Sequence, residues 1–262
     1  MKSSTTKFAL VTGASQGLGN AFAHEVARRG INLILTSLPG EGLPETAQDI
    51  IERYHVKAVF FETDLSVNEN VLELARRVNE SYDVFMLINN AGLGGSRRFT
   101  DASSEYINTI LQLNIVATSL LTHQLLPNLL KQHDSYVLNV SSMAAFTPIG
   151  YKTVYPASKS FLHSFSRGLY EELKGTGVFV SVVNPGAMKT STEITSRIEK
   201  QGVLGRITLL DPDRVARKCI NGLFKKDTVI MVNPFSWLLM SLLPIWIKMP
   251  VMTNVVRREL NV

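Results

Sequence analysis

Tyr155 and Lys159 are the residues whose types and spacing most directly suggest chemistry. They stand four positions apart in a stretch with helical character, so both side chains project from one helix face. Tyrosine has an ordinary pKa of about 10, and an ammonium group about 4 Å away would stabilise its anion by roughly 4 kcal/mol. The pair is therefore a candidate acid–base pair for moving a proton to or from a substrate oxygen. Taken alone, the same spacing also describes two exposed residues on a helix.

A glycine-rich turn is the second candidate. The segment around Gly13, Gly17 and Gly19 lies between an apolar run and a helix-like run. Glycines in such a turn let the backbone approach a pyrophosphate, and the helix start offers free N–H groups and the positive end of its dipole. The spacing differs from the usual GxGxxG pattern, and a plain tight turn is the alternative. Its place after the first predicted strand favours a nucleotide-binding loop.

Short apolar runs alternate with helical patterns along the chain. Strands are predicted at 8–11, 32–36, 58–61, 84–88, 136–140, 178–183 and 228–232, and helices at 18–29, 44–53, 71–78, 105–130, 154–173 and 214–223. This order predicts an α/β fold with a parallel sheet of about seven strands, covered by helices on both faces. Right-handed crossovers make it a Rossmann-like doubly wound sheet with its ligand site at the carboxyl ends of the strands. No linker or repeat divides the chain, so a single domain over 1–262 is expected.

The composition narrows the classes of partner. Of the 262 residues, 45% are hydrophobic and 19% charged, as in ordinary globular proteins. The net charge of +5 is carried by scattered basic pairs rather than by a clustered stripe, so no nucleic-acid partner is expected. The five histidines have no metal-ligand spacing with one another or with Cys219, and no metal site is expected.

Several features predict where the protein resides. A single cysteine, Cys219, permits no intramolecular disulfide, which fits a cytoplasmic protein. The stretch from Met1 to Lys7 lacks the regions of a signal peptide. The most apolar stretch, Trp237 to Met252, is interrupted by two prolines and a lysine, and falls short of the ~20 apolar residues of a membrane span. We expect a cytoplasmic protein, with association to a membrane surface left open.

The glycine turn resembles the TGxxxGxG fingerprint of the classical short-chain dehydrogenase/reductase family. Further motifs of that family follow in order, each modest alone but specific as a set. They are Asp64-Leu65, Asn89-Asn-Ala-Gly92, Asn114, Ser142, Tyr155, Lys159, and Pro185-Gly186 followed by Thr190. The resemblance covers roughly residues 7 to 190, and the remaining C-terminal residues match only in general organisation.

The resemblance implies a catalytic set of Asn114, Ser142, Tyr155 and Lys159. Tyr155 would exchange the proton of a carbonyl or alcohol substrate, and Ser142 would hydrogen-bond the substrate oxygen. Lys159 would poise Tyr155 and bind the nicotinamide ribose, and Asn114 would hold a water that links Lys159 to solvent. Ser141 competes with Ser142, but the family spacing of 13 residues before Tyr155 favours Ser142 and leaves Ser141 a structural role.

The resemblance also implies an NAD or NADP cofactor. Its predicted contacts are Gly13, Ser15, Gln16, Gly17, Leu18, Gly19, Ser37, Asp64, Leu65, Asn90, Ala91, Gly92, Tyr155, Lys159, Pro185, Gly186, Met188 and Thr190. NAD-preferring relatives place an acidic residue where Ser37 stands, and NADP-preferring ones often have a basic residue at Leu38 or near Gln16. This chain has neither. Ser37 could donate to a 2′-phosphate, and no carboxylate there repels one, so NADP is favoured.

Two C-terminal segments are expected to shape the substrate site. In this family the region after Pro185-Gly186, here 187–210, forms a flap that covers the substrate. The extension 233–262 is rich in apolar residues. We weigh a helix that closes the core or buries a subunit contact against a pocket wall or a surface that rests on lipid. Either interpretation favours a hydrophobic carbonyl or alcohol substrate, such as a keto-lipid, an acyl ketone or a steroid.

Other functions remain open. Within enzymes, a 3-oxoacyl reductase of fatty-acid synthesis is the alternative. A non-catalytic NAD(P)-sensing protein of the same fold is a second class, although four intact catalytic residues argue against it. A peripheral membrane scaffold built on the C-terminal segment is a third. Members of the family are commonly homodimers or homotetramers through their two long helices, here 105–130 and 154–173.

Overall fold

A computed structural model describes residues 7–186, 188, 210–234, 237 and 242–260 of the chain. The expected flap over 187–210 therefore lies outside the described residues, except for its two ends. Those ends, Met188 and Leu210, form an isolated parallel β-bridge.

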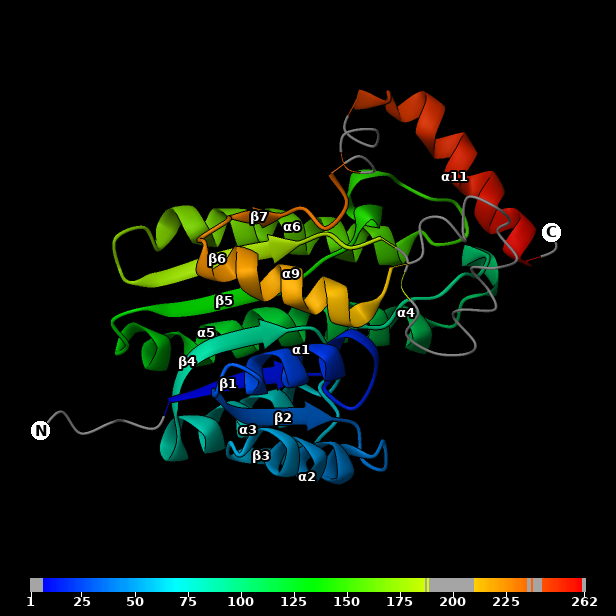
Figure 1. Cartoon of the computed structure of the whole chain (residues 1–262). Coiled ribbons are helices and arrows are strands. Elements are labelled where there is room, and N and C mark those ends of the chain that lie inside the picture. The colour runs from blue at the N-terminus through cyan, green and yellow to red at the C-terminus, as the bar shows by residue number, and fades with distance from the viewer. Residues whose placement is uncertain (1–6, 187, 189–209, 235–236, 238–241, 261–262) are drawn as a thin grey trace, which may run out of the picture.

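Seven parallel strands form one sheet in the order β3-β2-β1-β4-β5-β6-β7 (Figure 1). The strands are β1 (Lys7–Thr12), β2 (Asn32–Ser37), β3 (Ala58–Glu62), β4 (Asp83–Asn89), β5 (Ser135–Val140), β6 (Val178–Val183) and β7 (Val229–Ile230). The inner strands are buried almost throughout because helices cover both of their faces. The chain order reverses between β1 and β4, and this is where a doubly wound sheet binds its ligand. The predicted α/β fold is confirmed.

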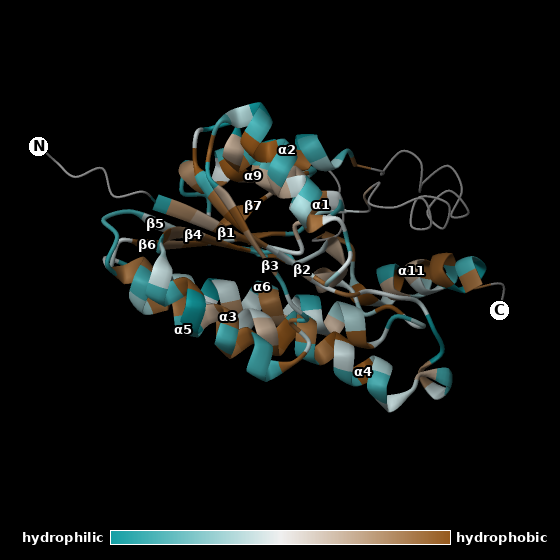
Figure 2. Cartoon of the chain, turned by 90° about the horizontal axis from the view of Figure 1, so that it is seen from below, coloured by the Kyte–Doolittle hydropathy of each residue, from teal (hydrophilic) through white to brown (hydrophobic). Residues whose placement is uncertain are grey.

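Helices form a layer on each face of the sheet (Figure 2). One layer holds α1 (Gly17–Ala27), α2 (Leu43–Tyr54) and α9 (Pro212–Phe224). The other holds α3 (Asn68–Ser81), α5 (Thr118–Leu130) and α6 (Val154–Glu172). Each layer packs its own apolar cluster against the sheet.

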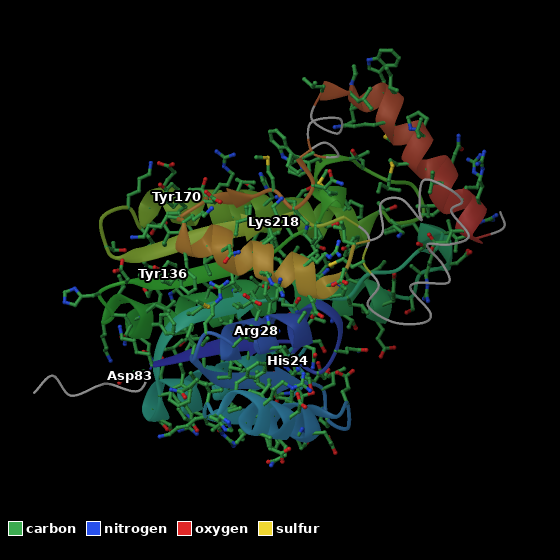
Figure 3. All side chains as sticks on the ribbon, in the orientation of Figure 1. His24, Arg28, Asp83, Tyr136, Tyr170 and Lys218 are labelled. Atoms are coloured by element: carbon green, nitrogen blue, oxygen red, sulfur yellow. The ribbon has the colours of Figure 1, made fainter. Side chains whose placement is uncertain are left out.

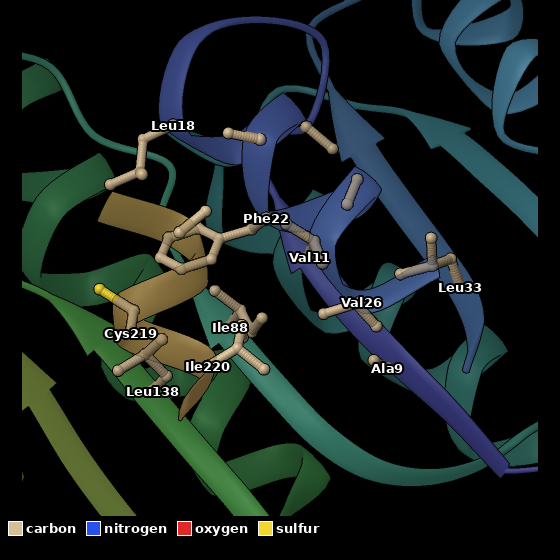
Figure 4. Close-up of a cluster of buried hydrophobic side chains, with 14 of the residues drawn as sticks. Ala9, Val11, Leu18, Phe22, Val26, Leu33, Ile88, Leu138, Cys219 and Ile220 are labelled. Carbon is tan, nitrogen blue, oxygen red and sulfur yellow. The ribbon is translucent and has the colours of Figure 1, made fainter. Parts of the chain in front are cut away.

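The first cluster fixes where the glycine turn lies. Phe22 of α1 is fully buried there, among Leu18, Ile88 and Cys219 (Figure 4). Burial raises the pKa of the Cys219 thiol, so this group stays protonated and serves as core packing. The helix that follows the turn is thus held by its apolar face, which leaves the amino end of the helix directed towards the sheet edge.

The long helical stretch predicted at 105–130 is interrupted. It consists of α4 (Ser104–Leu111), a π-helical turn η2 (Gln112–Ala117) and α5. Single π-turns inside helices are frequent at functional sites, and Asn114 lies within this one. Two short 3-10 helices that no pattern predicted, η1 (Phe99–Asp101) and η3 (Met143–Phe146), follow β4 and β5.

The C-terminal helix α11 (Ile245–Leu260) extends away from the two layers (Figure 1). Val256 is its one buried residue among those described, and Trp246 is 71% exposed. Of the alternatives for 233–262, closure of the core finds no support in the described residues of α11. Its apolar residues lie on a helix that projects from the domain and does not enter either cluster. Within the described ranges, no helix has the length and apolar character that crossing a membrane requires.

Candidate active site

The predicted site residues gather at the carboxyl ends of the strands. Asp83 and Tyr136, which Figure 3 labels, mark the opposite edge, where β4 and β5 begin. At the carboxyl edge, the segments that follow β1, β4, β5 and β6 meet around Tyr155, on the first turn of α6. Pro156 is also in that turn, where its missing N–H costs nothing.

The glycine turn has the geometry of a phosphate-binding loop. Gly13 and Gly17 have φ angles of 64° and 57°, which disfavour any other residue. A Cβ on Gly19 would lie only 1.8 Å from the carbonyl oxygen of Gly13. No side chain caps the amino end of α1 after Gln16, and its first turn holds no acidic residue. Its N–H groups are therefore available to an anion.

Asn90 holds the glycine turn from the neighbouring strand. Its Nδ2 donates to the carbonyl oxygens of Thr12 and Gly13, at 2.9 and 3.2 Å. In return, the Thr12 hydroxyl accepts from the backbone N–H groups of Asn90 and Ala91, each at 2.9 Å. The sequence analysis gave no role to Thr12, although Thr12 begins the TGxxxGxG fingerprint. Because of these reciprocal hydrogen bonds, the Asn90 side chain holds the glycine turn in place.

Asn114 fixes the segment after Gly92. Its Oδ1 accepts from the N–H of Leu93 at 2.8 Å, and its Nδ2 donates to the Leu93 carbonyl and to Ser158 Oγ, both at 2.9 Å. The side chain is fully buried and engaged by protein. A Cβ on Gly92 would lie 3.1 Å from Asn114 Oδ1 and 3.2 Å from Lys159 Nζ, so both groups line the same narrow space. The predicted role of Asn114 in holding a water that links Lys159 to solvent remains a prediction.

Ser142, Tyr155 and Lys159 meet as the resemblance implies. Ser142 is close enough to the Tyr155 hydroxyl to lower its pKa. Lys159 is buried, and its Nζ donates to the Val140 carbonyl at 2.9 Å and lies 5.8 Å from the centre of the Tyr155 ring. Ser141 instead donates to the backbone carbonyl of Lys159 at 2.7 Å. Ser142 thus faces the tyrosine, whereas Ser141 ties β5 to α6.

Burial moves the pKa values of this pair in opposite directions. Desolvation raises the pKa of Tyr155, and the hydrogen bond with Ser142 offsets part of the rise. Desolvation also lowers the pKa of Lys159 to about 8. The role of Lys159 in lowering the pKa of Tyr155 stays a prediction: in the chain without cofactor, burial is the main influence on Tyr155, and the Lys159 ammonium donates to the Val140 carbonyl. In this state Tyr155 is a protonated acid at neutral pH.

Three further predicted cofactor contacts, Ser37, Asp64 and Leu65, have side chains that already contact other parts of the protein. Ser37 is buried, and its hydroxyl donates to the Leu38 carbonyl at 3.1 Å rather than pointing into open space. Asp64 Oδ1 accepts from the backbone N–H and the hydroxyl of Ser66, at 2.8 and 2.7 Å. Leu65 is buried in the apolar cluster on the α3 side. Ser37 would reach a 2′-phosphate only if its present hydrogen bond broke.

Sequence reasoning also missed a carboxylate beside the glycine turn. Ser15 donates its hydroxyl to Glu41 Oε2 at 2.8 Å. Close by, Glu62 Oε1 accepts from the N–H of Gly40 at 2.9 Å. Glu41 lies in the loop after β2, where its sequence position gave no sign that it would fold back onto Ser15. Its carboxylate places a negative charge beside the glycine turn, where no acidic residue was expected from the sequence.

The segment after β6 completes the edge. The Pro185 carbonyl accepts from the N–H of Met143 at 2.9 Å, which fixes the residue after Ser142. Gly186 is half-buried, and Met188 pairs with Leu210. Thr190, the last predicted cofactor contact, lies outside the described residues.

The sheet is doubly wound, a glycine turn follows its first strand, and a serine, a tyrosine and a lysine lie together at its carboxyl edge. These features define a dinucleotide-binding type of α/β protein. The sequence matches the short chain dehydrogenase family over residues 7–201. The chain belongs to this family of oxidoreductases, and the resemblance seen in the sequence is confirmed.

Named relatives differ in activity. The chain is 34% identical to a very-long-chain 3-oxoacyl-CoA reductase of Anas platyrhynchos, over 72% of this chain and 62% of the relative. It is 32% identical to hydroxysteroid dehydrogenase-like protein 1 of Gallus gallus, over 73% and 59%. The chain thus spans about three fifths of the length of these two proteins. A human relative, 30% identical over 92% of this chain and 73% of its own length, is named inactive hydroxysteroid dehydrogenase-like protein 1.

Solved structures confirm the fold. A short-chain dehydrogenase of Sphingobium yanoikuyae in complex with NADPH superposes with a TM-score of 0.78 at 27% identity, covering 86% of this chain and 87% of the other. A bulky-bulky ketone specific alcohol dehydrogenase of Comamonas testosteroni gives 0.77 at 27% identity, covering 90% and 94%.

Proposed function

We propose that the protein is an NAD(P)(H)-dependent oxidoreductase that interconverts a ketone and a secondary alcohol. The observation that carries this proposal is the placement of Tyr155 with the buried Lys159, whose Nζ lies 5.8 Å from the tyrosine ring, and with Ser142 at the carboxyl edge of the sheet. Hydroxyl groups of this kind can hold and protonate a substrate oxygen. Their place at the switch point of the sheet puts them where a dinucleotide would lie.

The chain's own residues fit a dinucleotide. The glycine turn has no room for a Cβ at Gly19, and the amino end of α1 offers uncapped N–H groups for a pyrophosphate. The predicted contact at Gly92 borders Lys159, because a Cβ on this glycine would lie 3.2 Å from Lys159 Nζ. When bound, the nicotinamide group would supply or accept the hydride at the substrate carbon.

The proton follows a path through residues of this chain. Ser142 and Tyr155 hold the carbonyl oxygen by their hydroxyl groups, and Tyr155 gives its proton to that oxygen while the carbon gains a hydride. The C=O group becomes CH–OH, and Tyr155 is left as an anion until solvent re-protonates it. The Lys159 ammonium stabilises this anion because both groups are shielded from water. In the reverse direction Tyr155 takes the alcohol proton.

NADP(H) is the cofactor we favour, with NAD(H) as the alternative. No carboxylate stands at Ser37, and a relative with the same fold is bound to NADPH. Glu41 instead favours NAD(H), because its negative charge near Ser15 would repel a 2′-phosphate. Comparing kcat/KM for NADPH and NADH on one ketone decides between them.

A hydrophobic substrate fits the surroundings of Tyr155. A hollow of about 20 Å³ beside this residue is lined by Phe99, Ala102, Tyr106 and Ile110, together with polar residues that include Arg97 and Lys152. The names of the relatives, an acyl-CoA reductase and hydroxysteroid dehydrogenase-like proteins, support lipid-like substrates. A 3-oxoacyl reductase remains the alternative within enzymes, and a cofactor-sensing protein without catalysis is the alternative outside them.

A panel of ketones tests the proposal. Steroid, acyl and small hydrophilic ketones are mixed with the protein and NADPH or NADH, and cofactor absorbance is followed. We expect oxidation of the cofactor with apolar ketones at rates well above those with small hydrophilic ones. Tight cofactor binding with no turnover of any ketone, in either direction, would favour the sensing function instead.

The exposed side chains support two further expectations about assembly. Leu111, Leu130 and Phe161 on the long helical stretches are each more than a third exposed, as a homodimer or homotetramer through these helices would require. Leu242 and Trp246 are each 71% exposed at the start of the C-terminal helix, which suits contact of a cytoplasmic protein with a membrane surface. Light scattering tests the first, and co-sedimentation with vesicles the second.

A further inference from the structure

His163 lies on the face of α6 that carries Tyr155 and Lys159. The three residues follow one another at intervals of four, so their side chains project from the same side of the helix. His163 is half-buried, one turn beyond Lys159, and takes no part in the proton path of the proposed reaction. It is therefore a titratable group near the active site to which the proposed reaction gives no role.

The His163 ring contacts the turn that begins after Ser142. This turn is η3, and its last residue, Phe146, lies edge-on to the His163 ring with 5.0 Å between the ring centres. The hydroxyl of Ser160, also on α6, donates to the carbonyl of Ala145 at 2.6 Å. Side chains of α6 thus hold the far end of η3, while Ser142 caps its start.

The same ring contacts the segment that follows β6. Asn184 directly precedes Pro185 and Gly186, which are two of the predicted cofactor contacts. The side-chain Nδ2 of Asn184 lies 3.2 Å from His163 Nδ1. Because an amide nitrogen can only donate, Nδ1 accepts this hydrogen bond. The ring is therefore neutral and carries its proton on Nε2.

Asn184 depends on His163 for its hydrogen bonding. The Asn184 residue is 4% exposed, and its Oδ1 has no partner among the residues that the structure describes. Within the same ranges, the bond to His163 is the one hydrogen bond of this buried amide. Loss of the His163 acceptor would leave the amide unpaired in the interior. Such a loss favours another arrangement of Asn184 and of the backbone that carries it.

The backbone around Asn184 is bonded to the backbone around Ser142. Two hydrogen bonds join them, from the N–H of Ser141 to the Val183 carbonyl and from the N–H of Met143 to the Pro185 carbonyl, each at 2.9 Å. The residues on both sides of Ser142 are thus held by the residues on both sides of Asn184. A shift of Asn184 would therefore displace Ser142, whose hydroxyl is expected to hold the substrate oxygen.

Protonation of His163 would break this arrangement, because Nδ1 would then carry a hydrogen that faces the Asn184 amide N–H group. Burial lowers the pKa of His163 below its ordinary value of 6.5, the contact with Asn184 offsets part of the fall, and the charge of Arg167, one turn further along α6, lowers it again. The elements that face the ring from the other side, η3, β6 and 184–186, contain no charged residue. The ring is therefore neutral at pH 7 and gains its proton in acid.

We propose that His163 is a positioning residue of the active site. In its neutral form it accepts from Asn184 and packs on Phe146. These two contacts keep Ser142 aligned with Tyr155 and hold the predicted cofactor segment that follows Asn184. The proposal rests on the oxidoreductase function and adds to it a residue that acts through its neighbours. It follows that activity is lost in acid when the ring gains a proton.

Two replacements of His163 separate its hydrogen bond from its packing. In His163→Asn the side-chain oxygen takes the place of Nδ1 as an acceptor but cannot gain a proton. In His163→Phe the ring still packs on Phe146, but the acceptor is lost. With an apolar ketone and NADPH at pH 7.5, we expect kcat/KM to fall at least tenfold in His163→Phe and to stay within threefold in His163→Asn. Wild-type kcat/KM in His163→Phe would overturn the proposal.

A double variant tests whether His163 acts through Asn184. Asn184→Ala alone should lower kcat/KM at least threefold, but it should cause no further loss when added to His163→Phe, because the contact is already absent there. Losses that multiply in the double variant would show that the two residues act independently, and would overturn the proposal.

The pH profile is the measurement that a merely structural role would not change. In the wild-type protein we expect kcat/KM to decrease between pH 6.5 and 5, by up to about tenfold per pH unit below the pKa of His163. This decrease should be absent in His163→Asn and present in His123→Asn, a matched change of an exposed histidine on α5. The same decrease in His163→Asn would overturn the proposal, and this comparison stands even if His163→Phe fails to fold.

The outcomes separate the positioning role from the function on which it rests. If the variants and the wild-type protein turn over the ketone equally at every pH, the role of His163 is wrong and the oxidoreductase function stands. If no ketone is turned over, that function fails, and the Kd for NADPH, measured by calorimetry between pH 5 and 7.5, decides the role of His163. A rise in Kd in acid that is absent in His163→Asn would then support the role, and equal profiles would overturn it.

Discussion

Tyr155 and Lys159 have pKa values shifted in opposite directions by one cause, the removal of both groups from water. The spacing of the pair and the choice of Ser142 over Ser141 could be predicted from the sequence. The direction of the tyrosine shift could not, because it follows from how far folding removes this side chain from water. The Lys159 ammonium donates to the Val140 carbonyl, a contact that no sequence pattern encodes.

The Lys159 shift predicts a pH profile. The pKa of this group is about 8, so the ammonium is present below pH 8 and lost above it. Since the cation stabilises the Tyr155 anion left by ketone reduction, we expect kcat/KM for reduction to fall about tenfold per pH unit above pH 8. Initial rates between pH 6 and 10 at fixed cofactor concentration measure this, and a flat profile to pH 10 would contradict it. Lys159→Met should give a low and flat profile.

Glu41 predicts a change in cofactor preference. Its carboxylate accepts from Ser15 in the glycine turn, close to where a ribose 2′ substituent would lie. A unit charge at about 4 Å in water is worth about 1 kcal/mol, so Glu41→Gln should lower KM for NADPH about fivefold relative to KM for NADH. Glu52→Gln, on the exposed face of α2, is the control. An unchanged NADPH/NADH ratio in Glu41→Gln would remove this residue from the site.

Among the elements, the buried strands and the amphipathic helices were the most predictable from sequence, because continuous apolar runs and helical periodicity mark them directly. The strand predicted at 178–183 matches β6, and the helix predicted at 154–173 matches α6 to within one residue. The π-turn around Asn114 was not predictable, since it changes the hydrogen bonds of a stretch whose pattern remains helical. The projection of α11 depends on tertiary packing, which an apolar composition does not specify.

The close contact of the glycine turn with α1 predicts a sharp effect of one methyl group. In Gly19→Ala the new Cβ would lie 1.8 Å from the Gly13 carbonyl oxygen, so the turn must change shape. We expect cofactor affinity to fall at least a hundredfold, measured by calorimetry. Gly168→Ala is the matched control, because nothing lies within 4 Å of its Cβ in α6. It should bind cofactor normally and raise the free energy of unfolding by up to about 1 kcal/mol.

At the scale of the whole molecule, the doubly wound sheet explains why residues spread from Gly13 to Gly186 meet in one place. The carboxyl ends of parallel strands share one edge, and the strand order reverses between β1 and β4. Predicting this architecture from the alternation of strands and helices was enough to predict that the candidate site residues gather at this edge. The contacts that α11 and the loop around Glu41 make with that edge join segments distant in sequence, and only the structure reveals them.

The most direct test of the account is Tyr155→Phe, which removes one hydroxyl and keeps the ring. With an apolar ketone that the wild-type protein reduces, we expect kcat to fall at least a thousandfold while the Kd for NADPH stays within threefold. Tyr170→Phe serves as the control, because Tyr170 packs against Phe179 towards the other end of the same helix (Figure 3). Wild-type kcat in Tyr155→Phe would contradict the central claim that this hydroxyl transfers the substrate proton.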